Sequence, residues 1–309
     1  MRNNVDLVSL EIFCLVAEEL SITRAARILE RAPSNITTRV QQLEQSLNVD
    51  LFLRHNKRLQ LSREGEHFLG YARRILALAE EAQQMLQPNT PSGSLRIGSM
   101  ESSAATRLSP VLALYHQYWP RVRLEVTTGP SRQLLESVQQ HRIDCALAAL
   151  VPPCGDEPEE ELDAAGLTGQ PMFREELMLV LPSGHGEVRS ARDLAVRSLA
   201  AFRRGCTYRS IAENWFRDTG KGSLPEIQEV GSYHAMLACV ATGHCFSVIP
   251  ASLLALTPEH PGINPQPLCS CDTWLVWRQG YATPTLSSFR ELLAAGTPGA
   301  LKADDCRSQ

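Results

Sequence analysis

Pro33 divides the stretch from Ser21 to Glu44 into two short helical segments. Proline lacks a backbone N–H and its ring clashes with the preceding turn, so it is tolerated only at or before the first turn of a helix. A new helix must therefore begin at about Pro33 or Ser34. Upstream, the Ser21 hydroxyl can cap a first helix, and the compact apolar face of that helix consists of Ala25, Ala26, Ile28 and Leu29. The stretch predicts two helices joined by a tight turn.

The second helix of this pair has one apolar and one polar face. Spacings of four and three place Ile36, Val40 and Leu43 on the buried face. The opposite face carries short hydrogen-bonding side chains and one cation, with no carboxylate before Glu44: Ser34, Asn35, Thr37, Thr38, Arg39, Gln41 and Gln42. Such groups suit a surface that lies against base edges and phosphates. An ordinary helical hairpin would also fit this stretch taken alone.

A basic hairpin follows the second helix. Residues 51–54 and 59–61 read as two short strands around a polar tip, which is the position of a wing. Apart from one histidine, every ionisable residue from Leu51 to Arg63 is a cation: Arg54, Lys57, Arg58 and Arg63. A cluster of this kind can neutralise phosphates and release counterions. We therefore expect Arg54, Lys57 and Arg58 to contact a DNA backbone.

A family resemblance rests on these residues. The winged helix-turn-helix of LysR-type transcriptional regulators resembles the segment AARILERAPSNITTRVQQLEQSLNVDLFLRHNKRLQLSREG, in the family's usual place at the amino terminus. The resemblance covers the whole chain, and several later pieces resemble the subgroup that includes the putrescine-utilisation regulator: SMESSAATRL, TTGPSRQLLESV, AFRRGCTYR, ENWFR, SYHAMLACV and TWLVWR. The recognition helix departs from the family. Where relatives commonly start it with Ser-Gln-Pro-Ala-Leu-Ser-Arg, this chain has the residues from Ala32 to Thr38, so the usual Gln and Arg base readers are replaced.

Composition and charge agree with a soluble protein of several parts. A chain of 309 residues is long enough for two or three compact units, and 43% hydrophobic with 21% charged residues argues against disorder. The net charge is −4, but it is unevenly distributed. Between Met1 and Arg63, nine Lys and Arg face seven Asp and Glu, so this stretch is basic and the remainder is acidic. The acidic remainder need not touch DNA.

Two further features limit the class of protein. No apolar run reaches the roughly 18 residues of a membrane span, and the amino terminus lacks the apolar core of a signal peptide. We expect a cytoplasmic protein with no membrane contact. Its nine cysteines are scattered, odd in number and without a CxxC pair, so they describe neither a disulfide framework nor a structural zinc site. We expect no metal ion and no cofactor.

The segment from Arg63 to Leu86 predicts one long helix. Its apolar residues recur at alternating steps of four and three, as in the a/d seam of a coiled coil: Phe68, Ala72, Ile75, Ala79, Ala82 and Leu86. At roughly 35 Å, the helix is too long to hide this stripe against the small amino-terminal module. The alternative is a helix that lies on its own second domain. We expect a homodimer through this helix, because two recognition helices on one duplex need a fixed spacing, and the resemblance implies a tetramer.

The remainder alternates between strands and helices. Gln87 to Ser94 reads as a linker, after which strands at 95–98, 122–128 and 143–150 alternate with helices at 104–118 and 132–140. A break follows at 151–170, and the alternation resumes from 172 to 250. A strand at 273–277 and a helix at 286–295 close the chain. This pattern predicts parallel strands with helices on both faces. The expected parts are a DNA-binding domain at 1–63, a linker and dimerisation helix at 64–92 and an effector-binding domain at 93–309.

The fold predicted for the last part is a two-lobed α/β domain that resembles periplasmic binding proteins. The resemblance implies lobe I at 93–165 and 270–309, and lobe II at 166–269. Such lobes bind small molecules in the cleft between them, where helix N-termini attract anionic groups. Four loops are candidates: 99–103, 128–131, 202–207 and 245–247. The candidate effector-binding residues are Ser99, Glu101, Ser102, Ser103, Thr128, Arg203, Cys206 and Ser247. Alternatively, Ser102 or Thr128 only caps or ends an element.

Charged and reactive side chains in these loops suggest ligands. Arg203 and Arg204 could hold a carboxylate and Glu101 could meet an ammonium group, which favours a small zwitterion or a diamine-derived metabolite. Cys206 stands at the predicted start of a helix beside arginines, and both features would stabilise a thiolate. Peroxide sensors of the family have a reactive cysteine in a similar loop. Their resolving cysteine is missing here, since no other cysteine follows before Thr219. A thiol-based redox regulator is therefore the alternative function.

The sequence does not indicate an enzyme. The acidic run from Asp156 to Asp163 has too many carboxylates for a tuned acid–base pair and reads as a solvated loop. No GxSxG, P-loop, GxGxxG or HxxxH pattern occurs, so we expect no catalytic residue. A metabolite-binding protein whose wing serves protein contacts is a third possibility. The resulting expectation is a transcriptional regulator that binds double-stranded promoter DNA and a small-molecule effector, with RNA polymerase as a further candidate partner.

Overall fold

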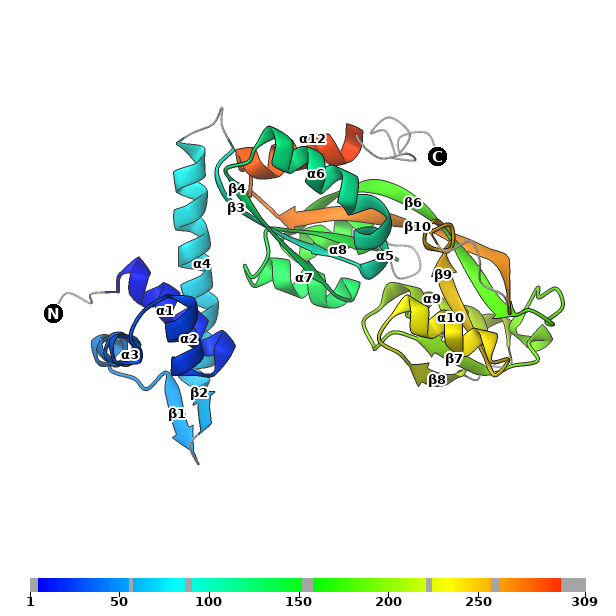
Figure 1. Cartoon of the computed structure of the whole chain (residues 1–309), viewed down its shortest axis with the longest axis horizontal. Helices are drawn as coiled ribbons and strands as arrows, with labels where there is room; N and C mark the ends of the chain where they lie inside the picture. Colours follow the sequence, from blue (N-terminus) through cyan, green and yellow to red (C-terminus); the bar gives the residue numbers. More distant parts are fainter. Residues whose placement is uncertain are drawn as a thin grey trace. The chain divides into compact units, whose positions relative to one another are not determined.

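The computed structural model describes residues 5–55, 58–86, 91–151, 158–220, 224–256 and 262–295. The residues up to Gln87 form one compact unit, here called unit 1, and nearly all the residues after it form a second, unit 2 (Figure 1). Unit 1 contains four helices and a two-stranded hairpin within the described residues: α1 (Leu7–Glu19), α2 (Ile22–Ile28), α3 (Pro33–Leu47), β1 (Phe52–His55), β2 (Arg58–Leu61) and α4 (Arg63–Met85).

The predicted pair of helices is confirmed. The Ser21 hydroxyl accepts a hydrogen bond from the Arg24 N–H at 3.3 Å and so caps α2. The N-cap of α3 makes no side-chain hydrogen bond, and the helix begins with Pro33, whose missing N–H would be unpaired in the first turn anyway. Ile36, Val40 and Leu43 are buried, as their spacing predicted.

Phe13 joins the helices of unit 1 to its hairpin. This fully buried ring of α1 meets Phe52 of β1 edge-on at 5.5 Å between centroids, and Phe68 of α4 at 5.3 Å. Such aromatic pairs add about 0.5–1.5 kcal/mol beyond the burial of their area. The hairpin is therefore part of the same core as the helices.

Glu44 attaches the end of α3 to the hairpin. Its carboxylate accepts hydrogen bonds from the N–H groups of Leu51, at 2.8 Å, and Phe52, at 3.0 Å. A charged acceptor makes these bonds stronger than neutral ones. The first acidic residue of α3 therefore fixes the direction in which the hairpin leaves the helix.

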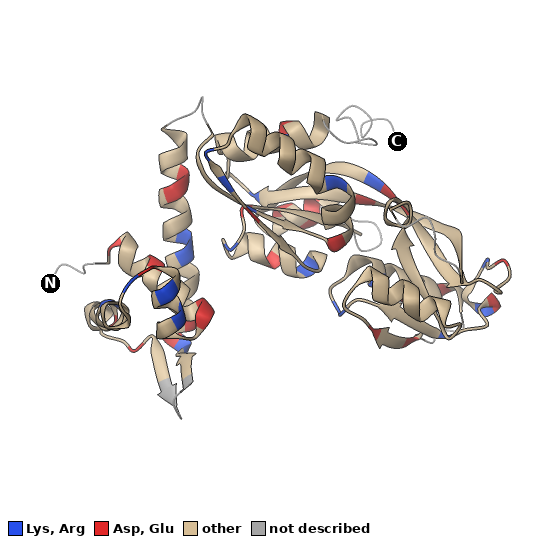
Figure 2. Cartoon of the chain, viewed as in Figure 1, with Lys and Arg blue, Asp and Glu red and all other residues tan. Residues whose placement is uncertain are grey.

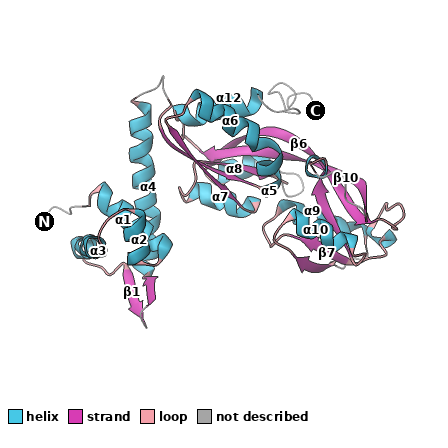
Figure 3. Cartoon of the chain, in the orientation of Figure 1, coloured by secondary structure: helices cyan, strands magenta, loops and turns pink. Residues whose placement is uncertain are grey.

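Unit 2 is built on an eight-stranded sheet with the strand order β4-β3-β5-β10-β6-β9-β7-β8. Figure 3 shows its strands and the helices that cover them. In chain order its elements are β3 (Gly93–Ser99), α5 (Glu101–Ser103), the π-helix η1 (Ala104–Leu108), α6 (Ser109–Tyr118), β4 (Val122–Thr128), α7 (Ser131–Gln139), β5 (Cys145–Ala149), α8 (Pro158–Ala164), β6 (Leu167–Pro182), η2 (Ala191–Asp193), β7 (Ser198–Ala201), α9 (Thr207–Thr219), β8 (Glu226–Glu229), α10 (Tyr233–Ala241), β9 (Cys245–Pro250), α11 (Ala251–Leu254), β10 (Ile263–Arg278) and α12 (Pro284–Ala295).

The sheet consists of two parallel halves joined by a pair of long strands. Lobe I holds β3, β4 and β5, and lobe II holds β7, β8 and β9; the pairs β3–β4, β3–β5, β7–β8 and β7–β9 are all parallel. Between the halves, β6 and β10 are 16 residues long each and pair antiparallel along their whole length. At one end β10 pairs with β5, and at the other β6 pairs with β9. This is the predicted two-lobed α/β architecture.

Two segments differ from the sequence-based expectations. Part of the region predicted as a break forms α8, whose first turn carries Glu159, Glu160 and Glu161. Acidic side chains near a helix N-terminus are favourable because of the helix dipole, so the acidic run predicted as a loop is helical from Pro158 on, and residues 152–157 lie outside the described ranges. The second difference is β10, which was predicted only from 273 on and extends back to Ile263.

Glu175, in β6, contacts both lobes. Its buried carboxylate pairs with Arg107 of η1 at 2.9 Å and accepts a hydrogen bond from the Ser252 hydroxyl of α11 at 2.6 Å. The Arg107 guanidinium also lies 5.3 Å from the centre of the Phe173 ring. A charge this deeply buried is tolerated because it is paired and hydrogen-bonded. Glu175 thus connects the π-helix η1 of lobe I to α11 of lobe II.

We predict that Glu175→Ala destabilises unit 2 by about 3–5 kcal/mol, because the largely buried Arg107 would lose the buried carboxylate with which it forms an ion pair. Glu176→Ala is the matched control: the next carboxylate of the same strand is exposed and should cost no more than about 0.5 kcal/mol. Denaturant titration of the full chain measures both. Equal stabilities of the two variants would contradict the role given to this ion pair.

A pair of glycines in α4 tests the packing of unit 1. A Cβ on Gly65 would lie 2.1 Å from the Leu51 carbonyl oxygen, whereas a Cβ on Gly70 would meet nothing within 4 Å. Gly65→Ala should therefore cost about 1–3 kcal/mol by overpacking, and Gly70→Ala should stabilise the helix by about 0.5–1 kcal/mol. Thermal unfolding would show opposite shifts, and a stabilising Gly65→Ala would refute the close packing of α4 on the hairpin.

Candidate functional site

The polar face of α3 is exposed. Ser34, Asn35 and Thr38 present their side chains to solvent, with Gln41 and Gln42 in the following turn. These are amide and hydroxyl groups on one face of a regular helix, which is an arrangement that can read base edges in a major groove. Three of the predicted DNA-binding residues are therefore exposed on the polar face of α3, as contact with DNA would require.

Two other predicted residues of α3 are engaged within unit 1. Thr37 is half-buried, and its hydroxyl donates to the Pro33 carbonyl oxygen at 3.0 Å. Arg39 is exposed, but its guanidinium lies 3.7 Å from the carboxylate of Asp6, which caps α1. An exposed ion pair is worth at most about 1 kcal/mol, so Arg39 can leave Asp6 for a phosphate. Thr37 and Arg39 therefore already have partners within unit 1, unlike the exposed side chains described above.

The remaining predicted DNA-binding residues, Arg54, Lys57 and Arg58, lie in or between β1 and β2. Arg54 lies in β1 and Arg58 in β2, where Arg54 is opposite Leu59 and Arg58 is opposite His55. Lys57 lies outside the described residues, as do the side chains of Arg54 and Arg58. Figure 2 shows basic and acidic residues interspersed over the described part of unit 1. Affinity for phosphates therefore depends on where the cations stand and not on a uniformly basic surface.

One face of α4 exposes large apolar side chains at coiled-coil spacing. The stripe is formed by Tyr71, Ile75, Leu78, Ala82 and Met85, and its four large members are between 43% and 65% exposed. The predicted seam was one position out of phase at its start, because Phe68 and Ala72 pack in the core of unit 1 instead. The exposed stripe still repeats at steps of four and three, so it has the pattern of a helix-pairing surface.

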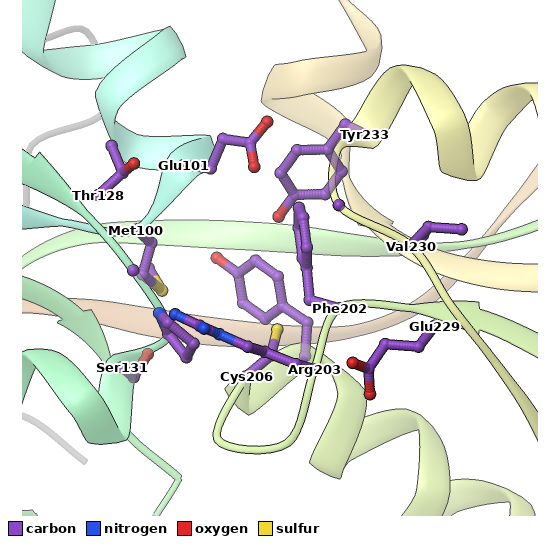
Figure 4. Close-up of a pocket in the computed structure, with 14 residues that line it drawn as sticks. Met100, Glu101, Thr128, Ser131, Phe202, Arg203, Cys206, Glu229, Val230 and Tyr233 are labelled. Atoms are coloured by element: carbon purple, nitrogen blue, oxygen red, sulfur yellow. The ribbon is translucent and has the colours of Figure 1, made fainter. Parts of the chain in front are cut away.

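A cavity of about 460 Å³ lies between the lobes of unit 2 (Figure 4). Lobe I contributes Met100, Glu101 and residues 128–131, which follow β3 and β4. Lobe II contributes residues that follow β7 and β8: Phe202, Arg203, Cys206, Tyr208, Glu229, Val230, Gly231 and Tyr233. Loops after the carboxyl ends of parallel strands are the usual ligand-binding positions of α/β sheets. The cavity is large enough for a small metabolite.

Only half of the predicted effector-binding residues line this cavity. Glu101, Thr128, Arg203 and Cys206 do, whereas the four predicted serines lie outside its lining, buried in their own elements. Ser99 donates to the Met100 carbonyl oxygen at 2.9 Å and Ser247 to the Ala200 carbonyl oxygen at 2.8 Å. Ser102 and Ser103 are each 2% exposed in α5. These four side chains do not line the cavity, and Ser99 and Ser247 show that a hydroxyl near the end of a strand can be satisfied within the fold. The 245–247 loop is part of the buried strand β9.

The cavity wall contains hydroxyls without a hydrogen-bond partner among the described residues. Ser131, at the N-terminus of α7, is one of them. Behind the wall, the hydroxyls of Ser102, Tyr208 and Thr273 lie near one another but form no hydrogen bond of acceptable geometry. Burial raises the pKa of the Tyr208 hydroxyl far above its usual value. Buried polar groups without partners cost stability, and their concentration at a cavity is typical of a binding site.

Glu101 begins α5 and faces the cavity. Its pKa is raised, first because burial penalises the charged carboxylate; a hydrogen bond from the Tyr233 backbone N–H and the nearby His234 oppose the shift. Glu101 forms no ion pair with any of the residues that the structure describes. The carboxylate is therefore only partly compensated in the structure.

The cations near the cavity already have partners. Arg203 donates to the Gln133 side-chain oxygen of α7 at 2.7 Å, across the lobes, and Arg204 is exposed outside the cavity lining. Arg209 is buried and binds Glu213 at 2.8 Å and Glu229 at 3.3 Å. A carboxylate ligand would have to compete with these contacts. The sequence-based prediction that the arginine pair holds a carboxylate is therefore not favoured by this geometry.

Cys206 is the N-cap of α9, as predicted, but its environment opposes a thiolate. Burial raises the pKa of the Cys206 thiol and outweighs the opposing effects of the amide groups of Tyr208 and Arg209 and of the Arg209 charge. A reactive thiol needs the opposite shift. Packing or ligand contact therefore fits this residue better than peroxide sensing.

Sequence reasoning missed two aromatic residues of the cavity. Tyr208 and Tyr233 stand in the first turns of α9 and α10, within the stretch for which only an alternation of strands and helices was predicted. The signal that could have found them is an aromatic residue directly after a loop that follows a strand. The loop from Glu229 to Tyr233 was missed for the same reason, because its only apparent feature was the end of a short strand.

Among the segments that the structure describes, no three His, Cys, Asp or Glu side chains are grouped as metal ligands would be. Within those segments, too, none of the helices has both the length and the apolar character needed to cross a bilayer.

Comparisons with known proteins match both units. The model of bacterial regulatory helix-turn-helix proteins of the lysR family matches residues 7–66, and the LysR substrate binding domain model matches residues 88–298. The HTH-type transcriptional regulator GltR of Bacillus subtilis (strain 168) is 32% identical over 287 residues, which cover 91% of this chain and 93% of GltR.

Solved structures of similar chains share the fold. Full-length CbnR in complex with its target DNA has a TM-score of 0.63 at 22% identity and covers 95% of this chain and 100% of that chain. A full-length OxyR variant from Pseudomonas aeruginosa has a TM-score of 0.69 at 18% identity, with 97% and 98% covered. At these identities the likeness establishes architecture, and ligands are not transferred from it.

Proposed function

The chain belongs to the LysR family of bacterial transcriptional regulators, and from this premise we propose that a small molecule held between the two lobes of unit 2 controls its binding to promoter DNA. Members of this family are regulators and not, in general, enzymes. The observation that carries the proposal is the presence of an exposed hydrogen-bonding face on α3 in one unit and a lined cavity in the other.

For the DNA contact, we assign different roles to the helix and the wing. Ser34, Asn35 and Thr38 read base edges, because their side chains are exposed and short. Arg54, Lys57 and Arg58 neutralise phosphates, which adds affinity without sequence preference. Thr37 and Arg39 have supporting positions, since both already contact groups of unit 1.

Two copies are needed to read a promoter. The exposed stripe of α4 gives one copy a surface for pairing with a second, which would remove large apolar side chains from water and fix the distance between two copies of α3. We extend the proposal to a dimer through α4 and, as in relatives, a tetramer. The functional parts are then 1–63, 64–92 and 93–309, acting in the cytoplasm, where promoter DNA is found.

The effector acts by selecting one arrangement of the lobes. Arg203 and Gln133 already join the lobes across the cavity, and the Thr207 hydroxyl donates to the Ala149 carbonyl oxygen at 2.9 Å. A ligand that binds one arrangement more tightly shifts the population toward it, and only such differential affinity can drive a change. The motifs quoted above favour the putrescine-utilisation subgroup as the nearest functional comparison.

The thiol-based alternative has weaker support. Cys206 lines the cavity, but its raised pKa and the absence of a following cysteine before Thr219 both argue against a peroxide-reactive thiolate. We therefore assign Cys206 to the lining of the ligand-binding cavity.

The α4 stripe gives a test of the dimer. Leu78→Glu should convert the protein to a monomer, because it places a charge in the centre of an apolar pairing surface. Gln83→Glu, an exposed residue of the same helix outside the stripe, is the control and should leave the assembly unchanged. Sedimentation velocity distinguishes the two, and a Leu78→Glu variant that remains a dimer would exclude pairing through this face.

Substitutions in α3 and the wing separate specificity from affinity. Arg58→Ala should weaken binding to all duplexes and reduce the slope of log affinity against log salt by about one. Asn35→Ala or Thr38→Ala should cost about 1–3 kcal/mol on the preferred site and little on unrelated DNA. Fluorescence anisotropy with the intergenic DNA upstream of the gene and a scrambled duplex measures both.

Arg189→Ala, which removes an exposed arginine of unit 2, is the control for a general charge effect. Unchanged affinity of Arg58→Ala at every salt concentration would show that the hairpin is not a DNA-binding wing.

A further inference from the structure

Aromatic rings form one wall of the cavity in unit 2. The Phe202 and Tyr233 rings meet edge-to-face, with centroids 4.9 Å apart and planes at 89°. Tyr208 is a third ring in the lining, and both tyrosines are almost completely buried. The faces of such rings carry negative electrostatic potential and attract cations. All three rings come from lobe II.

A carboxylate stands next to this wall. Glu101 of lobe I is beside Tyr233 in Figure 4, and the Tyr233 backbone N–H donates a hydrogen bond to it. Glu101 makes no ion pair with a described residue, and the desolvation that raises its pKa shows that the surrounding protein compensates its charge poorly. A cation in the cavity could therefore approach the Glu101 carboxylate and pair with it.

The other charged side chains near the cavity do not make its net charge positive. Arg203 is held by Gln133, and Arg209 is held by Glu213 and Glu229. Arg203 keeps its positive charge, because Gln133 is neutral, and the single charge of Arg209 is shared by two carboxylates. Among these side chains the carboxylates of Glu101, Glu213 and Glu229 outnumber the two guanidinium groups, so the net charge is negative. Glu101 is the carboxylate among them that forms no ion pair with a described residue.

From this arrangement we propose that the effector carries an ammonium group, which lies between the Glu101 carboxylate and the faces of the aromatic rings. The inference rests on the proposed function and makes it more specific, since it names the ligand class. A neutral ligand would displace water from Glu101 without replacing its interactions, which is unfavourable for a carboxylate. A carboxylate group on the ligand is not required, because Arg203 in the lining already donates to Gln133 and Arg204 lies outside the lining.

Binding also brings the lobes together in a defined way. The anion comes from lobe I and the rings come from lobe II, so an ammonium group contacts both lobes only when they are close. A ligand without the positive charge contacts the rings alone and gains nothing from Glu101. The charge of the ligand is therefore what distinguishes the closed arrangement from a more open one.

Isothermal titration of the full-length protein with three matched probes tests the proposal: n-butylammonium, n-butanol and n-butyrate. The ammonium compound should bind at millimolar concentrations or below, and the alcohol and the carboxylate should bind at least about tenfold more weakly. Glu101→Gln should lower the affinity for n-butylammonium by roughly tenfold. Glu136→Gln, an exposed carboxylate of α7 outside the cavity lining, should leave it unchanged.

A second substitution tests the rings. Phe202→Leu keeps an apolar side chain but removes the aromatic face, so affinity for n-butylammonium should fall by about threefold or more while that for n-butanol stays the same. Circular dichroism confirms that the variant is folded. If the two affinities fall together, the ring contributes only apolar area and the cation–π part of the proposal is refuted.

The dependence on pH distinguishes a rival arrangement in which protonated Glu101 donates a hydrogen bond to the ligand. In our proposal the carboxylate must be ionised, so affinity decreases as pH falls through the raised pKa of Glu101; in the rival it increases. His234 lies close enough to interact with the Glu101 charge, so the decrease should persist in His234→Gln. The other ionisable groups around Glu101 are Cys206, Tyr208, Glu229, Tyr233 and Arg203.

Equal binding of alcohol and amine, no binding of the amine, or a Glu101→Gln variant with full affinity would each overturn the proposal. The proposed function is judged separately. If n-butanol or n-butyrate occupied the cavity and changed the affinity of the full chain for promoter DNA, effector control would stand and only the ammonium class would be wrong.

Discussion

The antiparallel pairing of β6 with β10 is the constraint on which the structure depends. The two strands of 16 residues share one ladder of backbone hydrogen bonds that runs from lobe I to lobe II, and each lobe adds its parallel strands to one end of it. The lobes can therefore change their arrangement only by twisting or bending this ladder. The register shifts at Pro267/Cys269 and Thr273/Trp274 are irregularities in β10 where such a change would be easiest. The cavity lies between the two halves and is lined by residues of both lobes. A ligand that binds there therefore contacts both lobes, and its affinity depends on how the lobes are arranged.

Several polar side chains around the cavity lack the partners that would stabilise them. Glu101 is a partly buried carboxylate without an ion pair among the described residues, and the hydroxyls of Ser131 and Tyr208 lack hydrogen-bond partners there. By contrast, the buried carboxylates away from the cavity are fully paired: Glu175 with Arg107, and Asp144 with Arg96 at 2.8 Å. Unpaired polar groups are unfavourable in a protein interior. Glu101, Ser131 and Tyr208 all belong to the cavity lining, where a ligand can supply the missing interactions.

Local features of the chain allowed much of the fold to be predicted. Pro33, the spacing of Ile36, Val40 and Leu43, and the α/β alternation located the helix pair and the two lobes, because each acts through neighbours in sequence. The first half of β10 was missed because Pro265 and Pro267 and its half-exposed residues do not resemble a strand, and only pairing with β6 makes it one. Phe68 and Ala72 were predicted to lie on the dimerisation surface of the long helix, but they pack in the core of unit 1. The heptad pattern could not distinguish the two, because it is the same for a helix that packs in a core and for one that pairs with a second helix. In the cavity, sequence located three of the four candidate loops but only half of the candidate side chains. The Ser99 hydroxyl bonds to the carbonyl of the next residue and the Ser247 hydroxyl to Ala200, 47 residues away, and neither contact is visible in the sequence pattern.

The central claim is that occupancy of the cavity and binding of DNA are linked in one molecule. It is tested most directly by measuring the affinity of the full chain for a compound that occupies the cavity, first without DNA and then with saturating promoter DNA. Linkage requires that DNA changes the ligand affinity by the same factor by which the ligand changes the DNA affinity. The account predicts equal factors, both different from one. A ligand affinity that is the same with and without promoter DNA would contradict it.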